Sequence, residues 1–104
     1  MHQFRKGSKK VEEKELVRKM KDGEKNAFDE LYSLYCKPLL RTVYLIVGNR
    51  SDAEDIVQET FVKVFLYAKE LKKEEGFRTW LYQIATRTAW ELGKKNAMRF
   101  WMKK

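Results

Sequence analysis

The feature that most limits the fold is a set of apolar residues that recurs at helical spacing. Counted from the first member, they fall at intervals of three, four, seven, eleven, fifteen and eighteen residues, which keeps them on one face of an α-helix. The members are Phe28, Leu31, Tyr32, Tyr35, Leu39, Val43 and Ile46. Pro38 lies inside this run and predicts a kink near residues 34–37, because proline removes a backbone donor and clashes with the preceding turn. Gly48-Asn49 predicts the end of the helix.

Three further helices are predicted around this one, and strand signals are nearly absent. The first is expected from about Glu12 to Lys21, ending at Asp22-Gly23. The third is expected to begin at Ser51, with Glu54 at capping-box spacing, and the fourth near Arg78–Thr79. The expected core face of the third is Ile56, Val57, Thr60, Phe61, Val64, Phe65 and Ala68, and that of the fourth is Trp80, Leu81, Ile84, Ala85, Thr88, Ala89 and Leu92. The predicted fold is all-α, a compact bundle of about four helices.

The length of 104 residues supports one such domain. Residues 1–10 hold four basic residues, no acid and a Gly-Ser pair, so we expect a flexible basic arm followed by a helical domain over residues 11–104. Residues 70–76 lose the helical rhythm and are expected to form a loop.

Several function classes are excluded by what the sequence lacks. The only histidine is His2 and there is no glycine-rich phosphate loop, so we expect no enzyme and no cofactor. A metal site at Asp52, Glu54, Asp55 and Glu59 is disfavoured, because acidic residues at a helix start are explained by the helix dipole. The single cysteine, Cys36, is expected to be a buried free thiol. No apolar run could span a bilayer or act as a signal peptide, so a soluble cytoplasmic protein is expected.

The formal charge of +8 is unevenly placed. Residues 51–60 hold four acids and no base, whereas residues 78–104 hold seven bases and one acid, Glu91. A basic partner for the third helix and an anionic partner for the fourth would explain this, and so would two ordinary solvated helix faces.

The expected fourth helix has a second stripe beside its apolar one: Gln83, Arg87, Trp90 and Lys94. An aromatic ring between cations suits single-stranded nucleic acid, because bases stack on tryptophan and phosphates pair with Lys or Arg. The alternative is that Trp90 packs in the core. On the third helix, Asp55, Gln58 and Glu59 share one side by their spacing, either as a binding surface or as a solvated face.

Three segments in order resemble region 2 of bacterial sigma factors of the extracytoplasmic-function (ECF) group. They are Ala-Phe-Asp-Glu-Leu-Tyr-Ser-Leu-Tyr at residues 27–35, Asp-Ala-Glu-Asp-Ile-Val-Gln-Glu-Thr-Phe at 52–61, and Phe-Arg-Thr-Trp-Leu-Tyr-Gln-Ile-Ala at 77–85. The resemblance covers roughly residues 12–100 and implies a domain that binds core RNA polymerase and opens the promoter −10 element. In that family the Asp-x-x-Gln-Glu helix docks on the clamp helices of the β′ subunit. This role would fall to Asp55, Gln58 and Glu59, with Asp52 and Ile56 as neighbours.

The resemblance also implies a DNA-binding surface for the −10 non-template strand, with an extruded base held at the loop over residues 70–76. The residues that would take part are Leu71, Lys72, Lys73, Arg78, Gln83, Thr86, Arg87, Trp90, Lys94, Lys95 and Arg99. The chain departs from the family at Arg87, where Asn is common, and in the loop, which has Leu-Lys-Lys in place of Phe-x-Gly. The family's promoter preference is therefore not carried over to this chain, because Asn can read a base edge whereas Arg favours guanine or phosphate.

The family's second domain, with a helix-turn-helix, does not follow in this sequence, so we expect a fragment of a two-domain factor, the alternative being a protein with region 2 alone. The alternative function is a sigma-like helical interaction module, held by an anti-sigma factor or regulating another protein. A membrane-surface helix is disfavoured, because the basic residues do not oppose one dedicated apolar face.

Overall fold

The computed structural model describes residues 6–102, with side chains described for residues 12–99 and 102. Over this range the chain forms four α-helices, two short 3-10 helices and no strand. The elements are α1 (Lys6–Lys21), α2 (Lys25–Val47), α3 (Arg50–Tyr67), η1 (Ala68–Glu70), η2 (Glu74–Gly76) and α4 (Phe77–Met102). The prediction of an all-α bundle of about four helices is confirmed.

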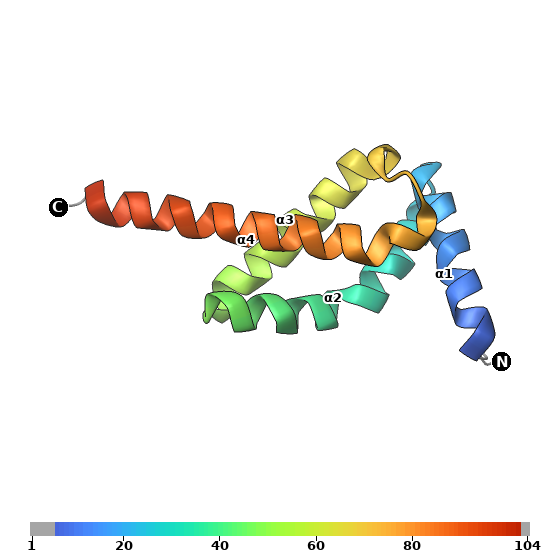
Figure 1. Cartoon of the computed structure of the whole chain (residues 1–104), viewed down its shortest axis with the longest axis horizontal. Helices are drawn as coiled ribbons and strands as arrows, with labels where there is room; N and C mark the ends of the chain where they lie inside the picture. The colour runs from blue at the N-terminus through green and yellow to red at the C-terminus, as the bar shows by residue number, and fades with distance from the viewer. Residues whose placement is uncertain (1–5, 103–104) are drawn as a thin grey trace.

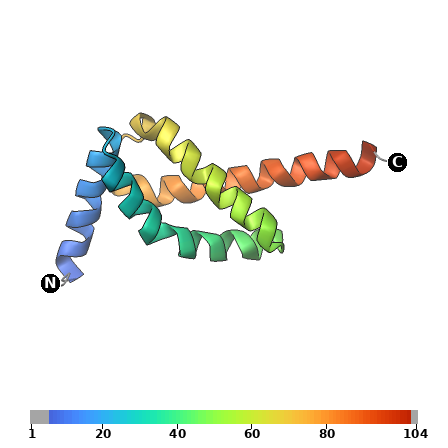
Figure 2. The same cartoon turned by 180° about the vertical axis from the view of Figure 1, so that it is seen from behind.

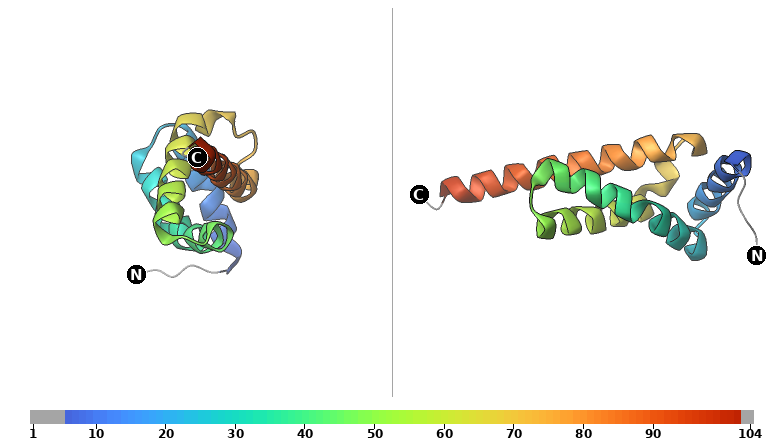
Figure 3. Two further views of the ribbon diagram at one scale, coloured as in Figure 1. Left: turned by 90° about the vertical axis from the view of Figure 1, so that its left-hand side faces the viewer. Right: turned by 90° about the horizontal axis from the view of Figure 1, so that it is seen from below.

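The helices form an elongated bundle of 57 × 26 × 19 Å. Helix α3 crosses α4 at an angle, and α2 runs beside both (Figures 1 and 2). Figure 3 shows α4 along one side of the bundle and extending well past its end. No helix within residues 6–102 has both the length and the apolar character needed to cross a membrane.

Two glycines end helices, as the sequence predicts. Gly23 and Gly48 have φ angles of 91° and 71°, in the left-handed region that side chains with a Cβ rarely adopt. The Gly48 N–H donates to the Tyr44 carbonyl at 2.8 Å and closes α2. The turns between α1, α2 and α3 are therefore short.

The start of α3 differs from the prediction. Asn49, not Ser51, is the N-cap, because the Asn49 side chain accepts a hydrogen bond from the Asp52 N–H at 2.9 Å. Ser51 lies inside the first turn, and Glu54 pairs with Arg50 at 3.0 Å instead of reaching back to a capping residue.

Two other boundaries also differ. Helix α1 begins at Lys6 rather than near Glu12, so the expected arm overlaps this helix, and its residues 1–5 lie outside the described range. The expected loop over residues 70–76 contains η2, and α4 begins directly after it at Phe77.

Pro38 lies inside α2, which remains one continuous helix. Figure 1 shows this helix changing direction near its middle, as the prediction of a kink requires.

The core joins one face of every helix. Its largest fully buried side chains include Phe77, Leu31, Leu39, Ile56 and Leu81. The rings of Tyr35 and Phe77 meet edge-on, with their centroids 5.6 Å apart.

Two residues predicted for the core lie outside it: Ile46 is 54% exposed and Phe65 is 59% exposed. Both have correct helical spacing, but each lies at the margin of its apolar face, where the neighbouring helix leaves most of the residue exposed.

Candidate functional site

The outward face of α3 brings together Asp55, Gln58 and Glu59. All three are exposed and lie on the side of the helix opposite its buried residues. On the α2 side, Gln58 Nε2 donates to the Tyr32 hydroxyl at 3.2 Å. On the α4 side, Glu59 Oε2 lies 3.5 Å from Lys63 Nζ. Both margins of this polar strip are therefore held in place, and the Asp55 carboxylate lies between them.

The two residues predicted beside this polar strip, Asp52 and Ile56, differ in their exposure. Asp52 is partly exposed at the start of α3, where its backbone N–H is capped by Asn49. Ile56 is only 1% exposed and belongs to the core, so its predicted contact with a partner is wrong in this structure. One residue along a helix is a rotation of about 100°, which turns Ile56 away from the face that carries Asp55.

An exposed apolar row, missed in the sequence, continues the same face towards the end of α3. Val62, Phe65 and Leu66 are 55%, 59% and 62% exposed. The Phe65 ring meets Phe28 of α2 edge-on at 5.7 Å, which fixes its position without covering it. Contiguous apolar surface beside polar groups is typical of a protein-binding face. The signal was present in the spacing, but Phe65 had been assigned to the core.

The outward face of α4 carries the stripe predicted from the sequence: Gln83, Arg87, Trp90 and Lys94 are all exposed. Trp90 is 64% exposed, so the alternative that it packs in the core is wrong. Lys94 Nζ lies 5.0 Å from the centre of the Trp90 ring, a cation–π distance. Thr86 is exposed beside them, and its hydroxyl donates to the Gln83 carbonyl at 3.1 Å.

Three other predicted DNA-binding residues of α4 lie off this stripe. At about 100° per residue, Arg78, Lys95 and Arg99 lie roughly a third to half a turn away from Trp90. Arg78 stacks over the Tyr82 ring instead, with its guanidinium carbon 5.6 Å from the ring centre. Lys95 borders a shallow hollow of about 470 Å³ that reaches Glu59 on α3.

The loop before α4 is fixed to α1. Lys21 Nζ lies 3.5 Å from Glu74, and Lys14 lies 3.8 Å from Glu75. The pKa of Glu74 is lowered, chiefly by a hydrogen bond from its own backbone N–H, with Lys21 contributing. These contacts give the loop a defined position relative to the bundle.

The three loop residues predicted to contact DNA separate into two groups. Lys72 and Lys73 are exposed. Leu71 is 6% exposed and lies in the core, so its predicted role as a DNA contact is wrong in this structure. It instead anchors the loop that presents the two lysines.

Lys63 joins α3 to α4. Its Nζ donates to Thr88 Oγ1 at 2.9 Å and to Glu91 Oε1 at 3.4 Å. The same ammonium pairs with Glu59. The buried Thr88 hydroxyl in turn donates to the Ile84 carbonyl at 2.8 Å. This network fixes the relative position of the two outward faces.

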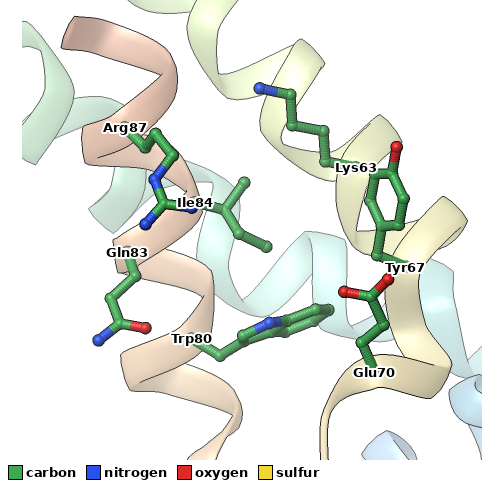
Figure 4. Close-up of a pocket in the computed structure, with 7 residues that line it drawn as sticks. All are labelled: Lys63, Tyr67, Glu70, Trp80, Gln83, Ile84 and Arg87. Carbon is green, nitrogen blue, oxygen red and sulfur yellow. The ribbon is translucent and has the colours of Figure 1, made fainter.

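A cavity of about 320 Å³ opens between the end of α3 and the start of α4 (Figure 4). Its lining residues are Lys63, Tyr67, Glu70, Trp80, Gln83, Ile84 and Arg87. Of these, the sequence predicts a binding role only for Gln83 and Arg87, because its spacing predicts a core position for Trp80 and gives no signal for Tyr67. Aromatic rings with nearby cations can hold a nucleobase.

In residues 6–102, no three His, Cys, Asp or Glu side chains converge where they could hold a metal ion. Cys36 is a free, half-buried thiol rather than a fully buried one.

Residues 31–97 match the family Sigma-70 region 2. The chain belongs to this sigma factor family. Among curated proteins, this region 2 domain is similar to "ECF RNA polymerase sigma factor SigW" of Bacillus subtilis, at 33% identity over 70% of the chain and 39% of the relative. It is 40% identical to "ECF RNA polymerase sigma-E factor" of Haemophilus influenzae, over 71% of the chain and 39% of the relative. The ECF resemblance is confirmed.

The region 2 fold is also that of a solved structure, an "engineered region 2 of sigmaE in complex with GTAAAA". The identity is 30%, the TM-score is 0.77, and the match covers 84% of this chain and 90% of that one. By contrast, the chain spans only about two fifths of the length of the curated relatives named above.

Proposed function

We propose that this chain is the part of an ECF sigma factor that binds core RNA polymerase and holds the non-template strand of the promoter −10 element. The observation that best supports the proposal is the region 2 structure bound to GTAAAA, which shares the fold at 30% identity. The two outward faces, of opposite charge, supply one surface for each partner. The chain would act by binding rather than by catalysis, in the bacterial cytoplasm where the polymerase works.

The outward face of α3 is the proposed polymerase surface. Asp55, Gln58 and Glu59 offer acceptors for charge-assisted hydrogen bonds from basic residues of the β′ clamp helices. The row formed by Val62, Phe65 and Leu66 would add apolar burial at about 25 cal/mol per Å². A protein that covered this face would block polymerase, and an anti-sigma factor of that kind is the second partner that we propose.

The outward face of α4 is the proposed DNA surface. Trp90 offers an exposed ring for base stacking, and Lys94, held over that ring, offers a cation for a phosphate. Lys72 and Lys73 extend the positive surface onto the loop. Because phosphate pairing releases counterions, affinity should fall as the salt concentration rises.

The polymerase surface is tested with Asp55→Ala and Gln58→Ala, with Glu30→Ala as the matched exposed-residue control on α2. We expect the first two to weaken binding to purified bacterial core polymerase by about ten- to a hundredfold, because an Asp or amide contact to a charged group contributes roughly 1.5–3 kcal/mol. Fluorescence anisotropy gives the dissociation constants, and circular dichroism checks that the helices remain. If both variants bind polymerase as tightly as the parent, α3 is not part of the polymerase interface.

The DNA surface is tested with the complex of chain and core polymerase on a labelled single-stranded −10 segment. We expect retention that declines with ionic strength and is weakened by Lys94→Ala. A complex that binds polymerase normally yet retains no strand at any salt concentration would favour the interaction-module alternative.

A further inference from the structure

We propose that the cavity between α3 and α4 selects a guanine base, with Arg87 binding the N7/O6 edge, Glu70 binding the adjacent N1/N2 edge, and Trp80 stacking on its face. The inference rests on the proposed DNA-binding function and extends it by naming the base. It depends on side chains that are particular to this chain, above all Arg87.

The cavity has two walls of different chemistry. Trp80, Gln83 and Arg87 project from α4, whereas Tyr67 and Glu70 come from the end of α3 and from η1. Figure 4 shows the Trp80 ring nearly edge-on at the base of the cavity, with Glu70 beside one end of it and Arg87 on the other side. A flat base placed over the indole would have one edge towards each charged group.

The charges available to a ligand are few. Lys63 also lines the cavity, but its ammonium is engaged by Thr88, Glu59 and Glu91. Arg87 and Glu70 are both exposed, and neither has an ion-pair or side-chain hydrogen-bond partner among the side chains described for residues 12–99. The cavity therefore presents one cation from α4 and one anion from η1 to whatever enters.

Guanine matches this pair of charges. Its N7 and O6 are two adjacent acceptors, the usual target of a bidentate arginine. Its N1–H and N2–H₂ are two adjacent donors, which a carboxylate can accept with both oxygens. Adenine and cytosine offer one amino group beside a ring acceptor, and thymine offers a single N–H between two carbonyls. Each of these bases would leave part of Arg87 or Glu70 unpaired, at a cost in affinity.

The volume of the cavity and its position next to the α4 stripe are suitable for one base of a bound strand. A cavity of about 320 Å³ is at the small end of the range of roughly 300–1,000 Å³ for small-molecule sites. Arg87 belongs both to the cavity and to the stripe that includes Trp90 and Lys94, so a strand lying along α4 could place one base in the cavity. Ile84 and Trp80 supply the apolar surface beneath it.

The test uses the whole chain and four fluorescein-labelled heptamers of thymidine, in which the central position is dG, dA, dC or dT. We expect the dG strand to bind about tenfold more tightly than the others at low salt, as one good bidentate contact discriminates by roughly that factor. Glu70→Gln and Arg87→Gln should each reduce this preference to less than about threefold, while binding of the all-thymidine strand changes little in Glu70→Gln. Glu75→Gln, an exposed acid on the same loop, is the matched control and should keep the preference.

Each outcome decides the inference. If the strands bind but dA, dC or dT equals dG, guanine selection is wrong and the proposed DNA-binding function stands. If Glu75→Gln abolishes the preference as Glu70→Gln does, the cavity carboxylate is not its source. Guanosine monophosphate should displace the dG strand only at concentrations at least a hundredfold higher; displacement at equal concentrations would indicate a free-nucleotide site instead. If no strand binds at any salt concentration, alone or with core polymerase, the proposed function fails together with the inference.

Discussion

The outward faces of α3 and α4 have the same relation to the core and opposite chemistry. Each helix buries one threonine, Thr60 or Thr88, whose hydroxyl donates to the carbonyl four residues earlier. Facing solvent, α3 presents carboxylates followed by an apolar row, whereas α4 presents cations around an exposed tryptophan. The inward residues therefore determine how the helix packs, and the outward residues determine which class of partner it can bind.

These two faces are not independent. Lys63 from α3 is shared by Glu59 on its own helix and by Thr88 and Glu91 on α4. The ammonium thus compensates acids beside the proposed polymerase surface and also holds the helix that carries the proposed DNA surface. Variants can therefore separate what the shared core, each face and the Lys63 connection contribute to stability and to binding.

A substitution in the shared core should weaken the binding activities of both faces together. Phe77 is fully buried against Tyr35 and Trp80. Phe77→Ala should lower the free energy of unfolding by about 3–5 kcal/mol, measured by urea denaturation, and weaken both kinds of binding together. Thr79→Ala, an exposed change two residues along, is the control. Loss of only one binding activity would show that the faces do not depend on a common core.

Removing the aromatic ring of α4 should affect one face alone. Trp90→Ala is expected to reduce single-strand affinity by about 1–3 kcal/mol, because base stacking is lost. Polymerase affinity and the urea midpoint should stay close to those of the parent, since the ring is exposed. A large fall in stability would instead give Trp90 a packing role.

Tyr35 of α2 contacts both α1 and α4 and provides a pH test. Its hydroxyl donates to Glu13 at 2.8 Å, and burial, together with this bond, raises its pKa well above the usual 10. The folded state therefore keeps the proton longer than the unfolded state, so the contribution is complete below about pH 10 and is lost as the pH rises beyond it. Tyr35→Phe should cost about 1–2 kcal/mol at neutral pH, and the difference from the parent should shrink between pH 10 and 11. Urea denaturation at each pH measures this, and a constant difference would contradict it.

Breaking the connection between the helices should have the smallest effect. Lys63→Met keeps an unbranched side chain that is one atom shorter and removes the bonds of the ammonium, so we expect a loss of about 1 kcal/mol in unfolding free energy. Lys72→Met, an exposed lysine of the loop, should change it by less than about 0.5 kcal/mol. Equal effects of the two variants would show that the connection contributes no stability.

Helix positions could be predicted from the sequence because apolar spacing and glycine are local signals. Gly23 and Gly48 end helices where predicted, and Trp90 lies on the predicted stripe. Spacing does not reveal how far a neighbouring helix extends, so it predicts a core position for Phe65, although the contact with Phe28 leaves 59% of the residue exposed. Capping depends on the actual turn, and Asn49 had a side chain as suitable as that of Ser51.

The cavity between α3 and α4 could not be predicted from the sequence. Tyr67 and Trp80 are thirteen residues apart and come together only because η1 and the loop reverse the chain and α4 packs on α3. No spacing rule within one helix links them. The positions of Glu70 and Arg87 on two sides of the cavity have the same origin.

Helix α4 continues beyond the bundle, and every side chain described from Gly93 to Met102 is exposed. At about 1.5 Å per residue, this end extends roughly 13 Å from its last support, so a tilt of roughly 10° at the bundle would move its tip by about 2 Å. A change in the angle between α3 and α4 would therefore displace this end further than it displaces the part of α4 that lies within the bundle.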